Sequence, residues 1–449
     1  MKNTRLTKRI ISLMAAMTLT LSAAGCASGD GNAEDIKNSG SNTNTTLKRA
    51  DESGEEIEPA AYRTGFEASG GELSEGFRKA AFKLSAELFR RTGGESIGQG
   101  ENVLVSPESV MLALGLAANG AAGDTLAQFE TLFGGSIGDI NDGLAVLISQ
   151  AKESESAEFD IANSIWVREG GMITLEPTYA ELCKRRLDAE SFLAPFDAKT
   201  LKALNGWVSD KTKGMIPSIK DAFEEDEVAV LINCIAFEAM WNDPYLEYSI
   251  DENGVFRNAK GGEEKCVMLS STENVYLEDD SFTGFMKYYD GGRYAFAALL
   301  PKEGKALTEC VEDLDGEALE ALLSGMNYGY EVHAKIPEFK FDFGGSIAKE
   351  IAAMGLDKAF ITDADFSAMA KTSTGQLFIG DIIHKTHIEV NRYGTKAAAA
   401  AEIEMKCGAA LIEDDKIKTV TLDRPFVMAI VDTRTSLPVF IGAVNSTEE

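Results

Sequence analysis

Histidine is scarce in this chain, which has three histidines among 449 residues. A serine hydrolase of the Ser-His-Asp type needs one as its general base, and the candidates are His333, His384 and His387. The letters Gly-Gly-Ser136-Ile-Gly match the G-x-S-x-G nucleophile motif, which requires a preceding hydrophobic strand. Residues 131–135 read Thr-Leu-Phe-Gly-Gly. We therefore interpret Ser136 as part of a glycine-rich turn and expect the protein not to be an enzyme.

Metal and cofactor motifs are also missing. His384 and His387 are three residues apart, and on a strand this spacing places them on opposite faces, which prevents joint ligation of a metal. No phosphate-binding loop and no dinucleotide-binding fingerprint occurs in the sequence. We expect neither a metal site nor a cofactor.

Positive charge is in short supply, with 43 Lys and Arg against 72 Asp and Glu, a formal net charge of −29. Phosphate binding needs a basic surface, so a nucleic-acid partner is excluded. The hydrophobic content of 44% supports a sizeable core and excludes disorder of the whole chain. We expect a soluble monomer with a self-repelling surface.

The amino terminus is typical of an export signal. Basic residues precede the apolar run at residues 10–21, which is well short of the roughly 20 residues of a transmembrane helix. Leu-Ser-Ala-Ala-Gly-Cys26 follows and resembles the lipobox of bacterial lipoproteins, although Ala23 stands where leucine is commonest. That resemblance implies a signal peptide at residues 1–26 and a lipid on Cys26, which would anchor the protein at the extracellular face of the bacterial membrane. The alternative is a plain cleaved signal and secretion.

Residues 27–76 are acidic and contain few large hydrophobic residues, so we predict a disordered tether. Roughly fifty flexible residues span about 40 Å on average, enough to hold a folded body away from a membrane. The rest of the chain, residues 77–449, contains no second linker of this kind, and we expect it to form one large domain.

The remaining cysteines are odd in number and widely scattered, without any CxxC spacing. They fit neither a disulfide framework nor a zinc site. We interpret Cys183, Cys234, Cys266 and Cys310 as small core residues. Cys407 differs because it lies beside the alanine-rich stretch described below, where an exposed thiol could be oxidised.

Mixed helix and strand patterns without regular alternation predict an α+β domain. Helical spacing marks residues 77–91, 110–119, 201–212 and 346–354, and we expect Gly93-Gly94 to end the first of these helices. Val228 to Trp241 is a long apolar run, typical of a strand buried on both faces. Further strands are predicted at residues 161–167, 294–300, 330–336, 376–390, 418–422, 426–431 and 439–444.

Residues 391–407 support two incompatible interpretations. Five consecutive alanines followed by Glu402 and Lys406 suit an exposed helix. The same residues also alternate as a half-buried strand requires, with one face formed by Thr395, Ala397, Ala399, Ala401, Ile403, Met405 and Cys407. A segment that can be exposed in one state and a buried strand in another is a candidate moving part.

Several of these stretches, in order, resemble the signature of the serpins, the serine-protease-inhibitor family. The resemblance covers about residues 77–449. The matching stretches are Asn102-Val-Leu-Val-Ser-Pro-Glu-Ser109, Asn205-Gly-Trp-Val with Thr212-Lys-Gly-Met-Ile216, Leu231-Ile-Asn-Cys-Ile-Ala-Phe237 with Trp241-Asn-Asp-Pro-Tyr245, His384-Lys385, Gly394-Thr395 and Asp423-Arg-Pro-Phe426.

The resemblance implies three β-sheets, eight or nine helices and an exposed reactive-centre loop before the last strands. In the family a protease cleaves this loop and becomes joined to it through an ester, and the freed hinge then inserts into the central sheet as an added strand. Loop insertion in serpins is a known example of strand addition. The implied function is irreversible suicide inhibition of extracellular serine proteases, with cysteine proteases as an alternative class of target. The implied partner is an elastase-like, subtilisin-like or trypsin-like protease.

The family's functional positions map onto this sequence as follows. The loop hinge corresponds to Gly394, Thr395, Ala397, Ala399 and Ala401. Polar groups beneath the central sheet, which gate its opening, correspond to Asn102, Ser106, Ser109, Asn233 and His384, with Trp241 near the point of loop insertion. Each of these is also compatible with an ordinary cap or a core residue.

The scissile bond is less well defined, because the span from Gly394 to Pro425 is longer than in the best-known animal members. Counting from the hinge places it at Gly408–Ala409, within two residues, and Lys406 and Cys407 are further candidates. A small residue there suits an elastase-like or subtilisin-like protease, whereas cleavage after Lys406 indicates a trypsin-like one.

Two departures from the family pattern concern the hinge. Arg392 and Lys396 stand where glutamate is usual, and we expect Arg392 to weaken pairing at the hinge, whereas Lys396 falls on the outward face. The competing interpretation is a binding or structural module that uses the same fold without loop insertion, which the helical reading of residues 395–407 favours.

Overall fold

The computed structural model describes residues 13–23, 65–153, 157–170, 172–373, 375–395 and 416–448. These residues form nine α-helices and three β-sheets, in agreement with the predicted α+β architecture. The α-helices are α1 (Glu75–Gly98), α2 (Pro107–Gly120), α3 (Gly123–Phe133), α4 (Ile137–Lys152), α5 (Pro177–Leu187), α6 (Ala198–Lys211), α7 (Leu307–Glu312), α8 (Gly316–Ser324) and α9 (Ala348–Ile351).

The central sheet contains the long strand predicted from the apolar run at 228–241. Its members are β1 (Leu13–Ala23), β3 (Glu158–Arg168), β5 (Ala189–Ala194), β6 (Glu227–Met240), β12 (Phe339–Ser346), β14 (Leu377–Asn391) and the short β15 (Gly394–Thr395). Across the sheet the order is β12, β14, then β15 and β1 together, then β6, β3 and β5. All neighbours are antiparallel except β3 and β5.

A second sheet of nine strands lies at the other end of the molecule and follows the order β16, β11, β8, β9, β10, β17, β18, β2, with β7 paired to β8. The strands are β2 (Val103–Val105), β7 (Ile250–Arg257), β8 (Glu263–Glu278), β9 (Phe282–Tyr288), β10 (Tyr294–Pro301), β11 (Asn327–Pro337), β16 (Ile417–Thr421), β17 (Phe426–Asp432) and β18 (Pro438–Val444). A small third sheet pairs β4 (Ile173–Leu175) with β13 (Ala370–Thr372).

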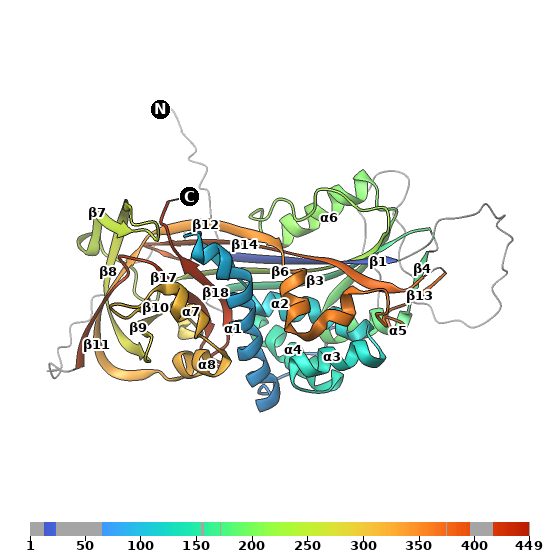
Figure 1. The fold of residues 1–449 in the computed structure, drawn as a ribbon, viewed down its shortest axis with the longest axis horizontal. Coiled ribbons are helices and arrows are strands. Elements are labelled where there is room, and N and C mark those ends of the chain that lie inside the picture. Colours follow the sequence, from blue (N-terminus) through green and yellow to red (C-terminus); the bar gives the residue numbers. More distant parts are fainter. Residues whose placement is uncertain are drawn as a thin grey trace, which may run out of the picture.

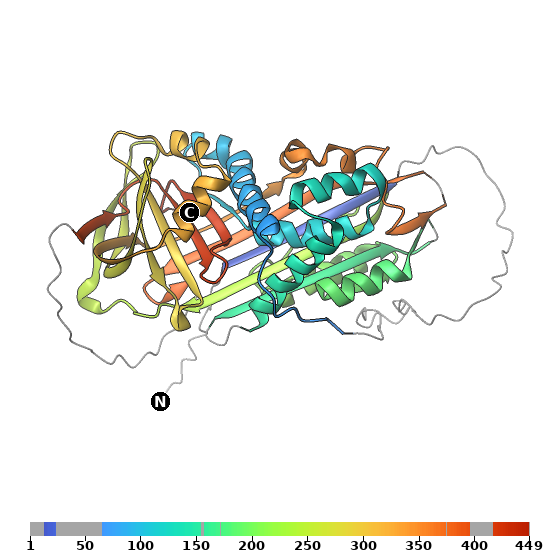
Figure 2. The same cartoon turned by 90° about the horizontal axis from the view of Figure 1, so that it is seen from below.

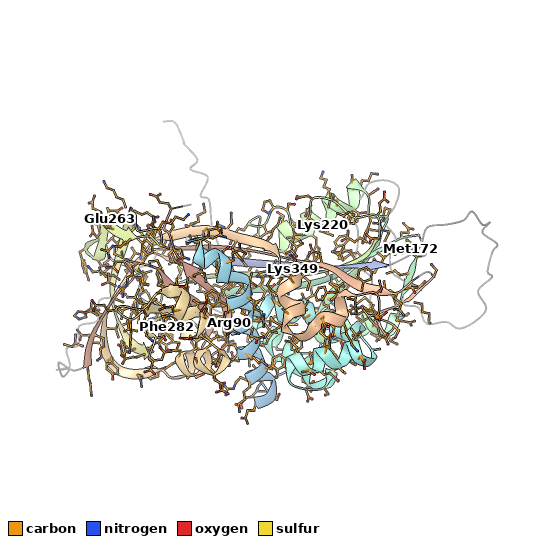
Figure 3. All side chains as sticks on the ribbon, viewed as in Figure 1. Arg90, Met172, Lys220, Glu263, Phe282 and Lys349 are labelled. Atoms are coloured by element: carbon orange, nitrogen blue, oxygen red, sulfur yellow. The ribbon has the colours of Figure 1, made fainter. Side chains whose placement is uncertain are left out.

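The central sheet is covered on both faces. Helix α6 lies on one side and α1 to α4 lie on the other (Figure 1). Figure 2 shows β1, in dark blue, running between the orange β14 and the yellow-green β6. Side chains fill both layers, and two of the labelled residues lie near opposite ends of the molecule, Met172 beside β4 and Glu263 beside β7 (Figure 3).

Two hydrophobic clusters follow the alternation of β6. Phe237, Ile235 and Leu231 belong to the main core beneath α1 to α4. The intervening Ala236, Cys234, Ile232 and Val230 belong to a smaller cluster with Leu204 and Val208 of α6. Both faces of this strand are therefore buried, as its sequence predicts.

The first helix continues beyond its predicted end. Helix α1 runs through Gly93 and Gly94 to Gly98. A Cβ on Gly93 would lie 3.0 Å from Cγ1 of Val103, so the glycine permits close packing against β2. The predicted helix at 346–354 is shorter than expected, because α9 passes at Ala352 into a wider turn that ends at Leu356, with Gly355 at φ +104°.

The last part of the predicted tether contacts the folded body. The amide of Glu67 donates to the carbonyl of Arg185, and the amide of Ser69 donates to the hydroxyl of Ser149. Phe66 packs against the main core, which gives this part of the tether an apolar anchor that its acidic composition does not indicate. Among the helices of the described residues, none is long and apolar enough to cross a membrane.

Candidate functional site

The central sheet contains a gap one strand wide between β6 and β14, and two separate segments fill it. At one end, β15 pairs with both borders, with Thr395 opposite Val390 of β14 and Ala239 of β6. The rest of the gap holds β1, which pairs antiparallel with both borders over most of its length. The sheet thus accepts a further strand at the position where the predicted loop hinge begins.

The hinge enters the sheet through Gly394. Its φ of +153° favours glycine, and a Cβ at this position would lie 2.2 Å from the carbonyl oxygen of Ala239. Thr395 is fully buried, and its hydroxyl lies 2.5 Å from that of Tyr289. Gly394 and Thr395, the two described residues of the predicted hinge, are therefore part of the sheet, whereas residues 396–407 lie outside the described residues.

Trp241 lies at the turn that leads into β15. Its indole Nε1 donates to the carbonyl of Asn391 at 2.9 Å, and its backbone amide donates to the carbonyl of Tyr393 at 3.0 Å. The ring stacks on Tyr289 with centroids 4.5 Å apart. Trp241 is thus a core residue that also holds the turn leading into the hinge, so the two interpretations of this residue are compatible.

Arg392, which we expected to weaken pairing at the hinge, has carboxylate partners in the structure. Its Nε donates to Glu338 at 2.8 Å and its Nη1 to Glu252 at 3.1 Å, while its backbone amide also donates to Glu338 at 2.9 Å. These carboxylates raise the pKa of Arg392 further above its ordinary value. The residue is basic where the family usually has an acid, and its partner Glu338 is acidic.

Reversing this ion pair tests its contribution. We expect Arg392→Glu to lower the free energy of unfolding by about 2 kcal/mol, because two carboxylates then face each other in a half-buried site. Urea denaturation measures the loss. The double variant Arg392→Glu with Glu338→Arg is the matched control, and we expect it to recover at least half of the loss. Equal stability of the two variants would show that this pair does not hold the hinge.

A chain of buried polar groups lies beneath the gap, at the first turn of α2. The hydroxyl of Ser109 donates to Oδ1 of Asn233 on β6, and the backbone amide of Ser106 donates to Nε2 of His384 on β14 at 3.1 Å. All four residues are fully buried. The start of α2 therefore contacts both strands that border the gap, which is the arrangement that the predicted gate requires.

Asn163 completes this network and was not predicted. Its side-chain oxygen accepts from Nδ2 of Asn233 at 2.9 Å, and its own Nδ2 donates to the carbonyl of Leu187 at 2.6 Å. The sequence signal that could have identified Asn163 is its side-chain amide within the apolar run 161–167, because a buried amide needs hydrogen-bond partners.

Asn102 lies elsewhere. It accepts hydrogen bonds from the backbone amides of Asn445 and Ser446 at 2.7 and 3.0 Å, and it donates to the carbonyl of Ser446. It therefore fixes the carboxyl-terminal segment and makes no contact with the gate network.

His384 is neutral at physiological pH. Burial lowers the pKa of its imidazole to about 3. Its Nε2 accepts a hydrogen bond from an amide, so the ring proton is on Nδ1, which lacks a hydrogen-bond partner among the described residues. A proton on Nε2 would break the bond to Ser106. The gate network is thus built for the uncharged ring.

The shifted pKa predicts how stability depends on pH. The unfolded chain protonates His384 below about pH 6.5, whereas the folded chain does so only near pH 3, so this residue destabilises the fold progressively as the pH falls between these values. The slope is about 1.4 kcal/mol per pH unit. We expect the stability difference between the native chain and His384→Gln to shrink with this slope from pH 6 to pH 4. A difference that does not change with pH would contradict the buried neutral ring.

The other two histidines, which the sequence offers as candidate general bases, and Ser136 have hydrogen-bond partners in the fold. His387 contacts Asp342 at 2.5 Å and His333 contacts Glu331 at 2.7 Å. Ser136 caps α4 through a reciprocal capping box with Asp139. Burial raises the pKa of the Cys183 thiol to about 12 and that of Cys266 to about 11, so these cysteines are poor nucleophiles.

Part of the predicted site lies outside the described residues. This part comprises the lipidation site Cys26, the hinge residues Ala397, Ala399 and Ala401, and the scissile-bond candidates Lys406, Cys407, Gly408 and Ala409.

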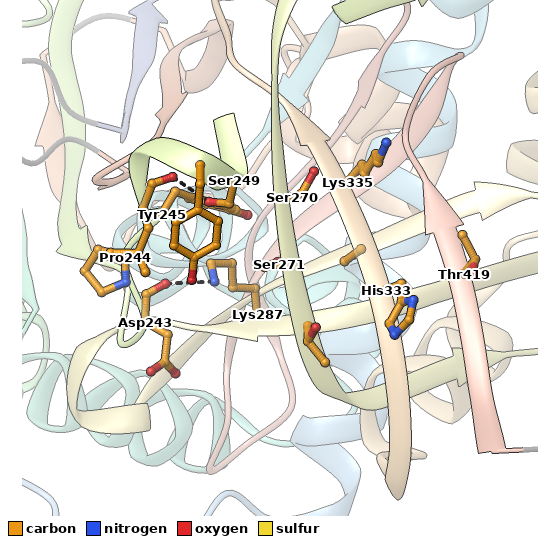
Figure 4. A pocket seen from close by; sticks show the side chains of 14 residues that line it. Asp243, Pro244, Tyr245, Ser249, Ser270, Ser271, Lys287, His333, Lys335 and Thr419 are labelled. Atoms are coloured by element: carbon orange, nitrogen blue, oxygen red, sulfur yellow. Dashed lines mark hydrogen bonds between the residues drawn. The ribbon is translucent and has the colours of Figure 1, made fainter. Parts of the chain in front are cut away.

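A cleft of about 630 Å³ lies beside the gap, between the two ends of the predicted loop. Figure 4 shows Tyr245 beside Lys287, with His333 of β11 and Thr419 of β16 on the opposite wall. Lys287 is buried and pairs with Glu273 at 3.0 Å. The backbone amide of Tyr245 donates to the carbonyl of Arg392, so the cleft and the hinge share a wall.

Comparison with known proteins identifies the fold. Residues 79–447 match the family model described as serpin (serine protease inhibitor). The curated protein Iripin-8 of Ixodes ricinus is 29% identical over 364 residues, and this match covers 77% of the present chain and 88% of the length of Iripin-8.

Crystal structures of a thermophilic serpin, tengpin, match in two states. The native state is 34% identical, has a TM-score of 0.77 and covers 86% of this chain and 98% of its own. The latent state is 33% identical, with a TM-score of 0.73 and coverage of 84% and 100%. The chain described here belongs to the serpin family.

Proposed function

We propose that this protein is an irreversible suicide-type inhibitor of extracellular serine proteases, and that cysteine proteases are a further class of target. The observation that supports the proposal best is the strand-wide gap between β6 and β14, into which the hinge residues Gly394 and Thr395 already extend. A loop cut on its carboxyl side can continue along the same path once the rest of the gap is vacant. The chain acts in this scheme as a trapped substrate and not as an enzyme.

The chemistry belongs to the protease. Its serine hydroxyl attacks the carbonyl carbon of the scissile bond, the amine on the carboxyl side leaves with the proton, and an ester joins the protease to the loop. Insertion of the loop before water hydrolyses this ester carries the protease along the sheet. About a dozen ladder hydrogen bonds at roughly 1 kcal/mol each, with apolar burial in addition, give a driving force on the order of 10 kcal/mol.

The buried network beneath the gap suits a gate for this movement. It links α2 to β6 through Ser109 and to β14 through His384, so separation of the two strands changes the contacts of one helix turn. Removing a single member leaves buried polar partners unsatisfied, at a cost of about 1–3 kcal/mol each. We propose that Ser106, Ser109, Asn163, Asn233 and His384 set the barrier to opening.

The target and the location are part of the proposal. Cleavage at Gly408–Ala409 suits an elastase-like or subtilisin-like protease, and cleavage after Lys406 a trypsin-like one. Acylation of Cys26 would hold the inhibitor at the outer face of a bacterial membrane, and a plain cleaved signal would release it. Mass spectrometry of the peptide released when a protease attacks the loop identifies the cut bond.

The test uses the chain purified after export. Incubation with elastase-like, subtilisin-like and trypsin-like proteases should give, with at least one of them, an adduct that survives a denaturing gel. If no protease forms such an adduct although the loop is cut, the chain is a binding or structural module with a serpin fold, the alternative that the helical reading of residues 395–407 favours.

A further inference from the structure

Strand β1 takes the place in the sheet that the inserted loop would need. Thr395 lies opposite Ala239 on β6, and Leu13 lies two residues further along, opposite Phe237. On β14, Thr395 lies opposite Val390 and Met14 opposite His387. Both borders thus give the same register. If the loop continued without a bulge, Ala397 would take the position of Leu13 and Ala401 that of Met17.

The sequence of β1 suits this position. Its odd-numbered residues from 13 to 21 are apolar and lie opposite β6 residues of the main core, apart from Met17, which lies opposite Asn233. Its even-numbered residues from 14 to 20 are small, hydroxyl-bearing or Met14, and they lie opposite β6 residues that face α6. No charge and no proline interrupts the strand.

The loop segment is the weaker of the two candidates for the gap. In the same register Glu402 and Glu404 would take the positions of Thr18 and Thr20, opposite Ile232 and Val230 of the buried face beneath α6. Burial of a carboxylate is unfavourable, whereas a threonine hydroxyl costs far less. The amino-terminal segment therefore competes with the loop on favourable terms.

We propose that residues 13–23 are a built-in occupant of the gap that blocks loop insertion until they are removed, so that the full-length chain is cleaved as a substrate and only the processed chain inhibits. This inference rests on the proposed function. Removal requires hydrolysis of a peptide bond on the carboxyl side of β1, such as Gly25–Cys26, with water as the co-reactant. A chain that folds before export is then protected from irreversible insertion of its own loop.

A disulfide test locates β1 without any measurement of inhibition. Ala16 lies opposite Cys234, a buried free thiol on β6, and directly opposed residues in an antiparallel pair are close enough for a disulfide. Full-length Ala16→Cys, made by cell-free translation and treated with oxidised glutathione, should give a peptide linking residues 16 and 234 on mass spectrometry. Ala15→Cys, opposite Ile235, is the matched control and should give none. Absence of the link in the first variant, or equal linking in both, would overturn the register.

An inhibition test measures the consequence. Full-length chain should form at least about tenfold less adduct than exported chain, and Met17→Glu should restore adduct formation because it places a charge opposite the buried residues Asn233 and His384. Thr18→Ser is the matched control, because it keeps a hydroxyl on β1 and adds no charge, and it should remain close to the full-length chain. Equal adduct yields from full-length and exported chain would refute the inference. If neither forms an adduct, the proposed function fails, while the disulfide still reports where β1 lies.

Discussion

Replacing Thr395 with arginine should convert the exported protein from an inhibitor into a substrate. Thr395 is fully buried, with its hydroxyl 2.5 Å from that of Tyr289. Like Gly394 before it, Thr395 pairs with both borders of the gap. A guanidinium there would be buried without a carboxylate, at a cost of several kcal/mol. The uncut variant avoids this cost by leaving residue 395 out of the sheet, so the cost falls on insertion. A cost of about 3 kcal/mol in the transition state slows insertion about 100-fold, and the protease hydrolyses the ester first.

The measurement is the fraction of protease that runs as an adduct on a denaturing gel. Thr395→Arg should reduce this fraction at least about tenfold while the loop is still cut at the same bond. Thr395→Ala is the matched control, because it loses the hydroxyl contact but adds no bulk or charge, and most of the adduct should remain. An unchanged adduct fraction in the arginine variant would contradict the assignment of the hinge.

Cutting the loop of the exported protein without trapping a protease should raise its Tm by roughly 20 °C. The reason is that loop insertion adds a driving force on the order of 10 kcal/mol, and for a domain of this size each kcal/mol shifts Tm by about 2 °C. A protease that cleaves near the carboxyl end of the loop and is not inhibited serves for the cut, and calorimetry measures the shift. The full-length chain is the control, because β1 already occupies the gap and the rise should be small.

The sequence predicted much of the framework, because the responsible residues act locally. The apolar run that became β6 needs two buried faces, and the short β-rich runs at 376–390 and 439–444 favour strands, whatever their neighbours are. The start of α2 also depends on local residues, because Pro107 is its first residue and the hydroxyl of Ser106 accepts from the amide of Ser109. Such signals depend only on residues a few positions away in the sequence.

Features that depend on distant partners could not be predicted in the same way. Arg392 looked unfavourable at the hinge, because Glu338 and Glu252 come together with it only in the folded protein. Asn102 carried the family pattern, yet its partners are at the carboxyl terminus. The end of α1 was predicted at Gly93, where packing against Val103 overrides the low helix propensity of glycine.

The role of the amino terminus shows the same limit. Residues 13–23 were interpreted by length and hydrophobicity as part of an export signal, and this interpretation stays a prediction. Their alternation as a strand is visible in the sequence, but only the register against β6 and β14 shows which gap it fits.

Hydrogen exchange on the exported chain with its loop cut is the most direct test that the loop becomes a strand of the central sheet. The backbone amides of residues 396–405 should then exchange as slowly as those of β6, because they form ladder hydrogen bonds with β6 and β14. Exchange of these amides within seconds, as in an unstructured peptide, would show that the cut loop remains in solvent and would contradict inhibition by insertion.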